Sequence, residues 1–198
     1  MRTESTADQI LRAAQELVRS RGFHGFRCLD LAIELEVGIA DVHKQFASKT
    51  ELGCRLIDRI QDGFGRKTAE IDRIQETASS RLVAYASLFE WSVRADELCL
   101  FGVLAAEVET LPLVMQKGIS RHFEQHRNWT TSVLRAGKAD GSLHFRGSPE
   151  AHARTITASF LGALIVTKIQ GSMGDFIAIR DLSINRYRSH EASGISMS

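Results

Sequence analysis

The chain contains only two prolines in 198 residues, Pro112 and Pro149. Because proline removes a backbone donor and clashes with the preceding helical turn, so few prolines leave long stretches open to helix formation. Apolar residues recur every three or four positions through these stretches, which is the spacing of an amphipathic helix. The sequence therefore predicts an all-α protein.

Acidic and basic residues almost cancel, with 25 Lys and Arg against 24 Asp and Glu. This balance neither indicates nor excludes a polyanionic partner, so a nucleic-acid surface must come from the local arrangement of charges. Residues 1–9 are polar and do not resemble a secretory signal. No apolar run approaches the roughly 20 residues that span a bilayer. We therefore expect a cytoplasmic protein without a membrane partner, and the scattered Cys28, Cys54 and Cys99 fit a reduced compartment.

The N-terminal region predicts three short helices. Residues 6–9 have the form of a capping box, and the helix that they open should end near Gly22. Two further helices fit residues 29–35 and 39–45, with only residues 36–38 between them. Two short helices joined by such a tight turn form a helix-turn-helix, whose second helix protrudes. A protruding helix fits a major groove about 12 Å wide.

The rest of the chain predicts a larger helical domain, giving about nine helices in all. A second capping box, Ser48 to Glu51, opens a long helix, and Ser148-Pro149-Glu150 opens another after a polar loop at 137–147. The other helices are expected at residues 82–93, 98–108, 113–135 and 176–188. We predict a DNA-binding domain at 1–50, a ligand-binding and dimerisation domain at 51–190, and a flexible tail at 191–198.

A set of apolar and small residues in the N-terminal region falls into one recognisable register. These residues are Ile10-Leu11, Ala13-Ala14, Leu17, Gly22-Phe23, Leu31-Ala32, Val37, Val42, Phe46, Ser48-Lys49 and Leu52. Their spacing, over residues 8 to about 55, resembles the DNA-binding domain of the TetR family of transcriptional regulators. The resemblance implies a homodimer with two partners, a double-stranded DNA operator and a small-molecule effector. It also implies that helices at about 149–170 and 175–188 form the dimer interface.

The resemblance carries DNA-binding roles onto eight positions of this chain. They are Arg27, Gly38, Ile39, Asp41, His43, Lys44, Gln45 and Lys49. Lys44 and Gln45 match groove or phosphate contacts, and His43 stands where the family commonly has a phosphate-contacting tyrosine. Lys49 matches a lysine at the start of its helix and is expected to bind backbone phosphate. Base discrimination would then belong to residues 39–44.

Four residues depart from the family pattern. Arg27 replaces the usual hydroxyl cap of the second helix, and losing such a cap typically costs about 1 kcal/mol. Gly38 replaces the usual serine cap of the third helix, which costs only a few tenths of a kcal/mol. Glu36 stands in the turn where glycine is common. Asp41 would be repelled by phosphate unless it accepts a hydrogen bond from a cytosine amino group. These changes affect the expected operator sequence rather than the fold.

The second half resembles one branch of the family more narrowly, through residues 98–107 and 134–143. That branch includes repressors tuned to small reactive or unsaturated carbonyl compounds. Seven residues are candidates for contact with a ligand: Phe89, Trp91, Cys99, Phe101, Phe123, Trp129 and Phe160. Aromatic residues at helical spacing are usually core residues, so we expect only some of these seven to line a cavity.

The favoured function is a ligand-released homodimeric repressor of a palindromic operator, with no catalytic residues, metal or cofactor. His122 and His126 lie four residues apart, but two ligands do not close a metal site, and a solvated pair is favoured. One alternative is a sensor in which an electrophile or oxidant modifies Cys99. Another is a helical ligand-binding dimer that has lost DNA binding through Arg27, Glu36 and Asp41.

Overall fold

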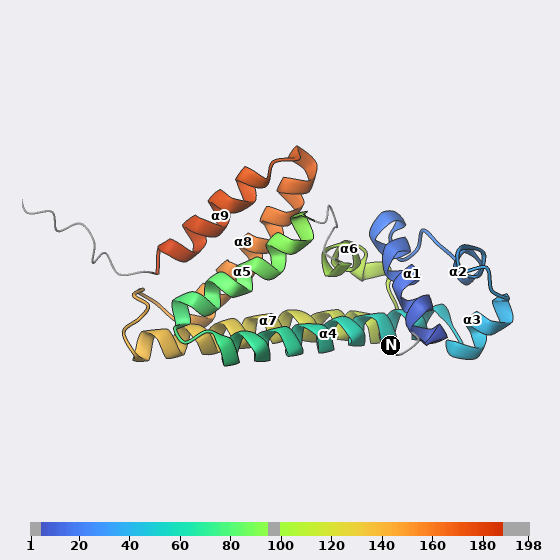
Figure 1. Ribbon diagram of the computed structural model, residues 1–198, viewed down its shortest axis with the longest axis horizontal. Helices are drawn as coiled ribbons and strands as arrows, with labels where there is room; N and C mark the ends of the chain where they lie inside the picture. The colour runs from blue at the N-terminus through green and yellow to red at the C-terminus, as the bar shows by residue number, and fades with distance from the viewer. Residues whose placement is uncertain (1–4, 95–99, 188–198) are drawn as a thin grey trace, which may run out of the picture. The chain divides into compact units, whose positions relative to one another are not determined.

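The structure is a computed structural model that describes residues 5–94 and 100–187, with side chains omitted at 92–94 (Figure 1). Within this part of the chain the secondary structure is helical without a β-strand, which confirms the all-α prediction. The helices are α1 Thr6–Arg21, α2 Cys28–Glu34, α3 Ile39–Gln45, α4 Lys49–Ile74, α5 Ala78–Arg94, α6 Leu100–Ala106, the 3-10 helix η1 Val108–Thr110, α7 Leu113–Ala139, α8 Pro149–Gln170 and α9 Met173–Asn185.

The chain packs as two compact units. The first unit comprises the residues up to Gly65 and a second stretch that ends at Phe123, and the second unit comprises the remainder. The long helices α4 and α7 therefore contribute to both units. The packing boundaries differ from the functional limits of 1–50, 51–190 and 191–198, which stay a prediction.

The first helix begins one residue earlier than the capping box at residues 6–9 implied. The side chain of Ser5 accepts a hydrogen bond from the backbone N–H of Asp8, at 3.2 Å, and Ser5 is the N-cap. The Ser5 hydroxyl also donates to the Asp8 carboxylate at 2.7 Å. The predicted end of the helix is confirmed, because Gly22 has a φ of 77° and its N–H donates to the carbonyl of Val18.

The start of α4 confirms half of the second capping box. The Ser48 hydroxyl accepts from the N–H of Glu51 at 3.1 Å. The Glu51 carboxylate accepts from the N–H of Ala47, at 2.9 Å, rather than from that of Ser48. Two backbone N–H groups at the start of α4 are thus satisfied by side chains, which fixes the residue at which α4 begins after α3.

Several helix ends in the later part of the chain differ from the predicted ones. The helix expected at 98–108 is described as α6 at 100–106 followed by η1, and α9 begins at Met173 rather than at 176. Helix α7 continues to Ala139, beyond the predicted end at 135, and includes Gly137. A Cβ at Gly137 would lie 2.5 Å from the Leu143 side chain, so glycine serves packing at this position rather than ending the helix.

Helix α8 begins as predicted. The Ser148 hydroxyl accepts from the N–H of Ala151 at 3.2 Å, and Pro149 is the first helical residue. The helix ends at Gly171, whose φ of 69° is left-handed. Helices α5, α8 and α9 pack against one another in the second unit (Figure 1). None of the described helices has the length and apolarity that a membrane span requires.

Candidate nucleic-acid interface and ligand-binding residues

Helix α3 is held in the first unit by one buried side chain. Val42 has 0% exposure, whereas the other six residues of α3 are exposed. The predicted contacts Ile39, Asp41, His43, Lys44 and Gln45 all lie among those six residues. A short helix with a single anchor leaves most of its circumference open to a partner, which is what insertion into a major groove requires.

The turn before α3 is closed by backbone hydrogen bonds. The N–H of Val37 donates to the carbonyl of Ala32 at 3.0 Å, and the N–H of Glu36 donates to that of Ile33 at 3.2 Å. Glu36 has a φ of 54°, the one left-handed residue other than glycine in the described chain. Such a conformation costs a residue with a Cβ about 1–2 kcal/mol.

Replacing Glu36 by glycine is expected to raise the free energy of unfolding. The gain should be about 0.5–1 kcal/mol, because relief of the left-handed strain exceeds the added entropy of an unfolded glycine. Denaturant unfolding of the purified chain measures it. Glu34→Gly, in the last turn of α2, removes the same charge at an unstrained residue and should lower the stability. Equal losses in both variants would contradict the strain at Glu36.

The N-terminus of α2 has a different cap from the hydroxyl that the family pattern favours. Arg27 is the N-cap, and its backbone N–H donates to the Asp30 carboxylate at 2.6 Å. The arginine side chain is 79% exposed, with its Nε 4.0 Å from that carboxylate. Asp30 therefore restores part of the lost cap, and the Arg27 guanidinium is placed at the surface. Gly38, the N-cap of α3, makes no side-chain hydrogen bond.

The ammonium group of Lys49 lies against the core of the first unit. It is 4.7 Å from the ring centroid of Phe23 and 4.2 Å from that of Phe26. It also donates to the carbonyl of Phe26. Burial lowers the pKa of Lys49, because desolvation disfavours the charged form, although nearby acidic groups oppose the shift. Lys49 thus joins α4 to residues 23–26, and its predicted phosphate contact stays a prediction.

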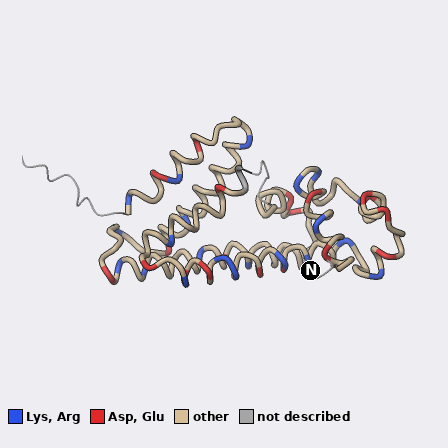
Figure 2. Tube along the Cα trace, in the orientation of Figure 1, with Lys and Arg blue, Asp and Glu red and all other residues tan. Residues whose placement is uncertain are grey.

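The candidate interface has no excess of positive charge. Residues 1–50 contain as many Asp and Glu residues as Lys and Arg residues, and Figure 2 shows both signs mixed along the helices. On α3 itself Asp41 and Lys44 are both exposed. Selectivity at this surface must therefore come from the placement of individual charges, because a general attraction to phosphate is weak when the charges cancel.

Two of the seven predicted ligand residues, Phe101 and Phe123, lie in the first unit. Phe101 has 2% exposure and stacks on the His122 ring, with centroids 3.5 Å apart. Phe123 meets the Phe101 ring edge-on, at 6.4 Å. The Phe64 ring lies 5.7 Å from His122. Phe101 is thus a buried packing residue, and His122 belongs to an aromatic cluster.

Three other predicted ligand residues come together in the second unit around Tyr85. Ring centroids of Phe89, Trp129 and Phe160 lie 5.1, 5.3 and 5.8 Å from that of Tyr85. The Tyr85 hydroxyl lies 2.8 Å from Nδ1 of His126. This cluster supplies what an organic ligand needs if space opens, namely apolar rings with a few polar groups among them.

The expectation of a solvated histidine pair is therefore wrong. His122 has 5% exposure, and His126 is half-buried beside Tyr85. Both rings pack against aromatic neighbours, which the spacing of the two histidines did not reveal. Among the described residues no group of three His, Cys, Asp or Glu side chains is placed to hold a metal ion.

Of the two remaining ligand candidates, only Trp91 is among the described residues, and it lies at the surface. Trp91 is 57% exposed, with the Lys67 ammonium 5.6 Å from its ring. Cys99 lies outside the described residues.

Burial raises the pKa of the Cys54 thiol, and the nearby Asp58 carboxylate adds to the shift. Both effects disfavour the reactive thiolate form of Cys54.

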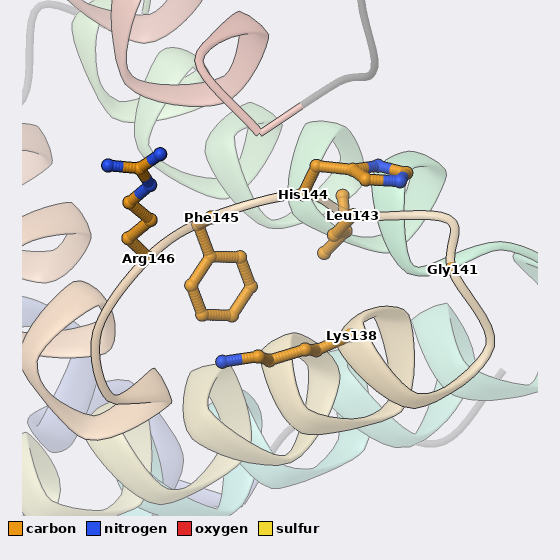
Figure 3. Close-up of a pocket in the computed structure, with 6 residues that line it drawn as sticks. All are labelled: Lys138, Gly141, Leu143, His144, Phe145 and Arg146. Carbon is orange, nitrogen blue, oxygen red and sulfur yellow. The ribbon is translucent and has the colours of Figure 1, made fainter.

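An open pocket of about 420 Å³ lies at the loop between α7 and α8 (Figure 3). Its lining consists of Lys138, Gly141, Leu143, His144, Phe145 and Arg146. None of the seven predicted ligand residues is among them. The Lys138 ammonium is 5.1 Å from the Phe145 ring and donates to the carbonyl of Gly147. The pocket is thus distinct from the Tyr85 cluster.

The chain is similar over most of its length to known regulators, although no protein-family model matches it. It is 24% identical over 176 residues to the HTH-type transcriptional repressor NemR of Escherichia coli K12, covering 84% of this chain and 86% of NemR. It is 25% identical over 166 residues to the HTH-type transcriptional repressor DhaR of Mycobacterium sp. GP1, covering 81% of each.

The fold of the chain also matches that of a solved structure. A TetR-family transcriptional regulator from Agrobacterium tumefaciens is 27% identical and superposes with a TM-score of 0.89, covering 92% of this chain and 97% of the other. A match that covers 92% of the chain extends into both units. These similarities in sequence and fold support the interpretation of the chain as a TetR-family transcriptional regulator.

Proposed function

We propose that the chain is a homodimeric DNA-binding repressor that a small-molecule effector releases from a palindromic operator. The observation that carries this function is α3, a short helix with one buried residue and six exposed ones. The six exposed residues of this helix contribute little to the packing of the chain itself, so their surface is available to a partner. The proposal is supported by similarity to two proteins named as transcriptional repressors.

Dimerisation is assigned to α8 and α9. Their surfaces carry apolar side chains that are exposed in a single chain, among them Ile165, Ile169 and Leu182 at 45%, 79% and 75%. Two helices from each copy would bury these side chains in a four-helix interface, and obligate dimer interfaces are rich in such residues. The dimer would present its two α3 helices to successive major grooves, about 34–36 Å apart.

The effector site is assigned to the aromatic cluster around Tyr85. A small carbonyl compound fits its chemistry, because rings can pack against an apolar body. The Tyr85 hydroxyl can donate its proton to a carbonyl oxygen when it accepts from a protonated Nδ1 of His126. Binding must favour a conformation whose α3 spacing no longer matches the operator. A coupling of about 1–3 kcal/mol corresponds to a loss of affinity of about 5- to 150-fold. Helix α4, which runs from Lys49 through both units, would carry the change.

The test of this function is selection of duplex DNA from a random pool by the purified chain without effector. Low salt is essential, because phosphate contacts make affinity strongly salt-dependent. We expect a palindrome whose half-sites lie about one helical turn apart. Failure of a folded dimer to enrich any sequence would refute the repressor function. It would favour the alternative of a helical ligand-binding dimer that has lost DNA binding.

A sensor acting through covalent modification of Cys99 is the less favoured mechanism. It differs from reversible binding in a simple way, since Cys99→Ser would abolish the response to electrophiles and leave operator affinity intact. Under the proposed mechanism the same variant keeps its response to a non-electrophilic effector. The comparison uses the operator recovered by selection.

A further inference from the structure

Glu107 connects the segment after α6 to the turn that leads into the helix-turn-helix. Its carboxylate accepts a hydrogen bond from the backbone N–H of Phe23, at 2.7 Å, across 84 residues of sequence. A Cβ on Gly22 would lie 2.4 Å from Glu107 Oε1, so the carboxylate occupies the space that a side chain would need. The absence of a side chain at Gly22 is therefore a requirement of this contact as well as of its left-handed φ.

A second hydrogen bond lies beside the first. The Thr110 hydroxyl donates to the carbonyl of Glu107, at 2.8 Å, and lies 3.1 Å from Nε2 of His24. Because the hydroxyl proton is directed to Glu107, Thr110 accepts from His24, which places a proton on Nε2 of that ring. The segment 107–110 thus holds two consecutive residues of the turn, one through its backbone and one through its side chain.

The held turn separates α1 from the DNA-reading helices. Residues 22–24 follow the last residue of α1 and precede α2, which begins at Cys28. Helix α6 packs on α1, so the segment after α6 has a fixed neighbour on one side of the turn. A turn held by residues 107–110, which follow a helix packed on α1, restricts how α2 and α3 tilt relative to α1.

We infer that Glu107 is a positioning residue for DNA binding, whose contact with Gly22 and Phe23 fixes the orientation in which α3 is presented. The inference rests on the proposed function, because orientation matters only when two α3 helices must match two half-sites at once. Without this restraint, the helix-turn-helix of each copy would sample several orientations. Binding would then have to select one of them, at a cost in affinity that preorganisation avoids.

The experiment measures affinity against half-site spacing. Duplexes carry the selected palindrome with its natural spacer, with the spacer lengthened or shortened by one or two base pairs, or with one half-site alone. For Glu107→Ala we expect about a tenfold lower affinity for the natural spacing and a much weaker preference over the altered spacings. Affinity for the single half-site should match the wild type, because α2 and α3 keep their own packing.

Two variants serve as controls. Glu109→Ala removes the same charge from an exposed neighbour in η1 and should bind like the wild type. Glu107→Gln keeps an oxygen that can accept from the Phe23 N–H and should restore most of the spacing preference. If Glu107→Ala does not fold, Thr110→Ala removes only the second contact and should weaken the preference by a smaller factor.

Each outcome has one meaning. An unchanged spacing preference in Glu107→Ala overturns the positioning role, and so does an equal loss on every duplex, which indicates general destabilisation. Faster hydrogen exchange at the Phe23 amide in Glu107→Ala is expected with or without DNA, and unchanged exchange overturns the contact itself. Failure of the wild type to bind any duplex refutes the proposed function and the positioning role with it.

Discussion

Lys44→Ala is expected to lower operator affinity by about 2–6 kcal/mol, which is at least about 30-fold. Lys44 is exposed on α3, next to the predicted contacts His43 and Gln45. A single lost contact costs about 1–3 kcal/mol, and a symmetric dimer loses it in both copies. Titration of the selected duplex at several salt concentrations measures the effect.

The salt dependence identifies what Lys44 contacts. Loss of a phosphate contact in each copy should reduce the salt slope by about two and leave the sequence preference unchanged. Loss of a base contact should relax the preference at one base pair of each half-site. Lys117→Ala is the matched control, because Lys117 is exposed on α7 and carries the same charge. Equal losses in the two variants would contradict the assignment of α3 as the reading helix.

Phe160→Ala is expected to lower the free energy of unfolding by about 3–5 kcal/mol. The Phe160 ring has 0% exposure and lies 5.4 Å from the Phe89 ring and 6.4 Å from the Phe176 ring, centroid to centroid. For a chain of this size such a loss lowers the melting temperature by about 6–20 °C. Calorimetry or denaturant unfolding measures it.

Trp91→Ala is the control for Phe160→Ala. Trp91 belongs to the same set of aromatic ligand candidates but is 57% exposed, so its removal should change the stability by about 0.5 kcal/mol or less. A small effect of Phe160→Ala would contradict its role as a core residue.

The fold was largely predictable because its signals are local. These signals act over a few residues: a serine before an apolar repeat, a proline at the first helical position, and a short turn between two helices. They predicted the first residues of α2, α3 and α8 to within one residue. The misplaced ends have tertiary causes. Helix α7 runs through Gly137, where glycine leaves room for the Leu143 side chain, and no local pattern distinguishes this packing glycine from a helix-ending one.

The candidate site was predictable only in part. The exposed residues of α3 followed from the position of Val42 in the register. The contact between Glu107 and Phe23 was missed, because it joins residues 84 positions apart and has no periodic signal. Phe160 and Trp91 share residue class and helical spacing, and only the packing of α5, α8 and α9 separates a core ring from a surface one.

The central claim, that α3 reads the major groove, is tested most directly by base analogues. In the selected operator, 7-deazaguanine and 7-deazaadenine remove the N7 acceptors of the major groove and leave the minor-groove edge unaltered. We predict that one substituted base pair within each half-site lowers affinity at least about tenfold, since each good base contact contributes about 1–3 kcal/mol. Unchanged affinity at every substituted position of the operator would contradict the claim.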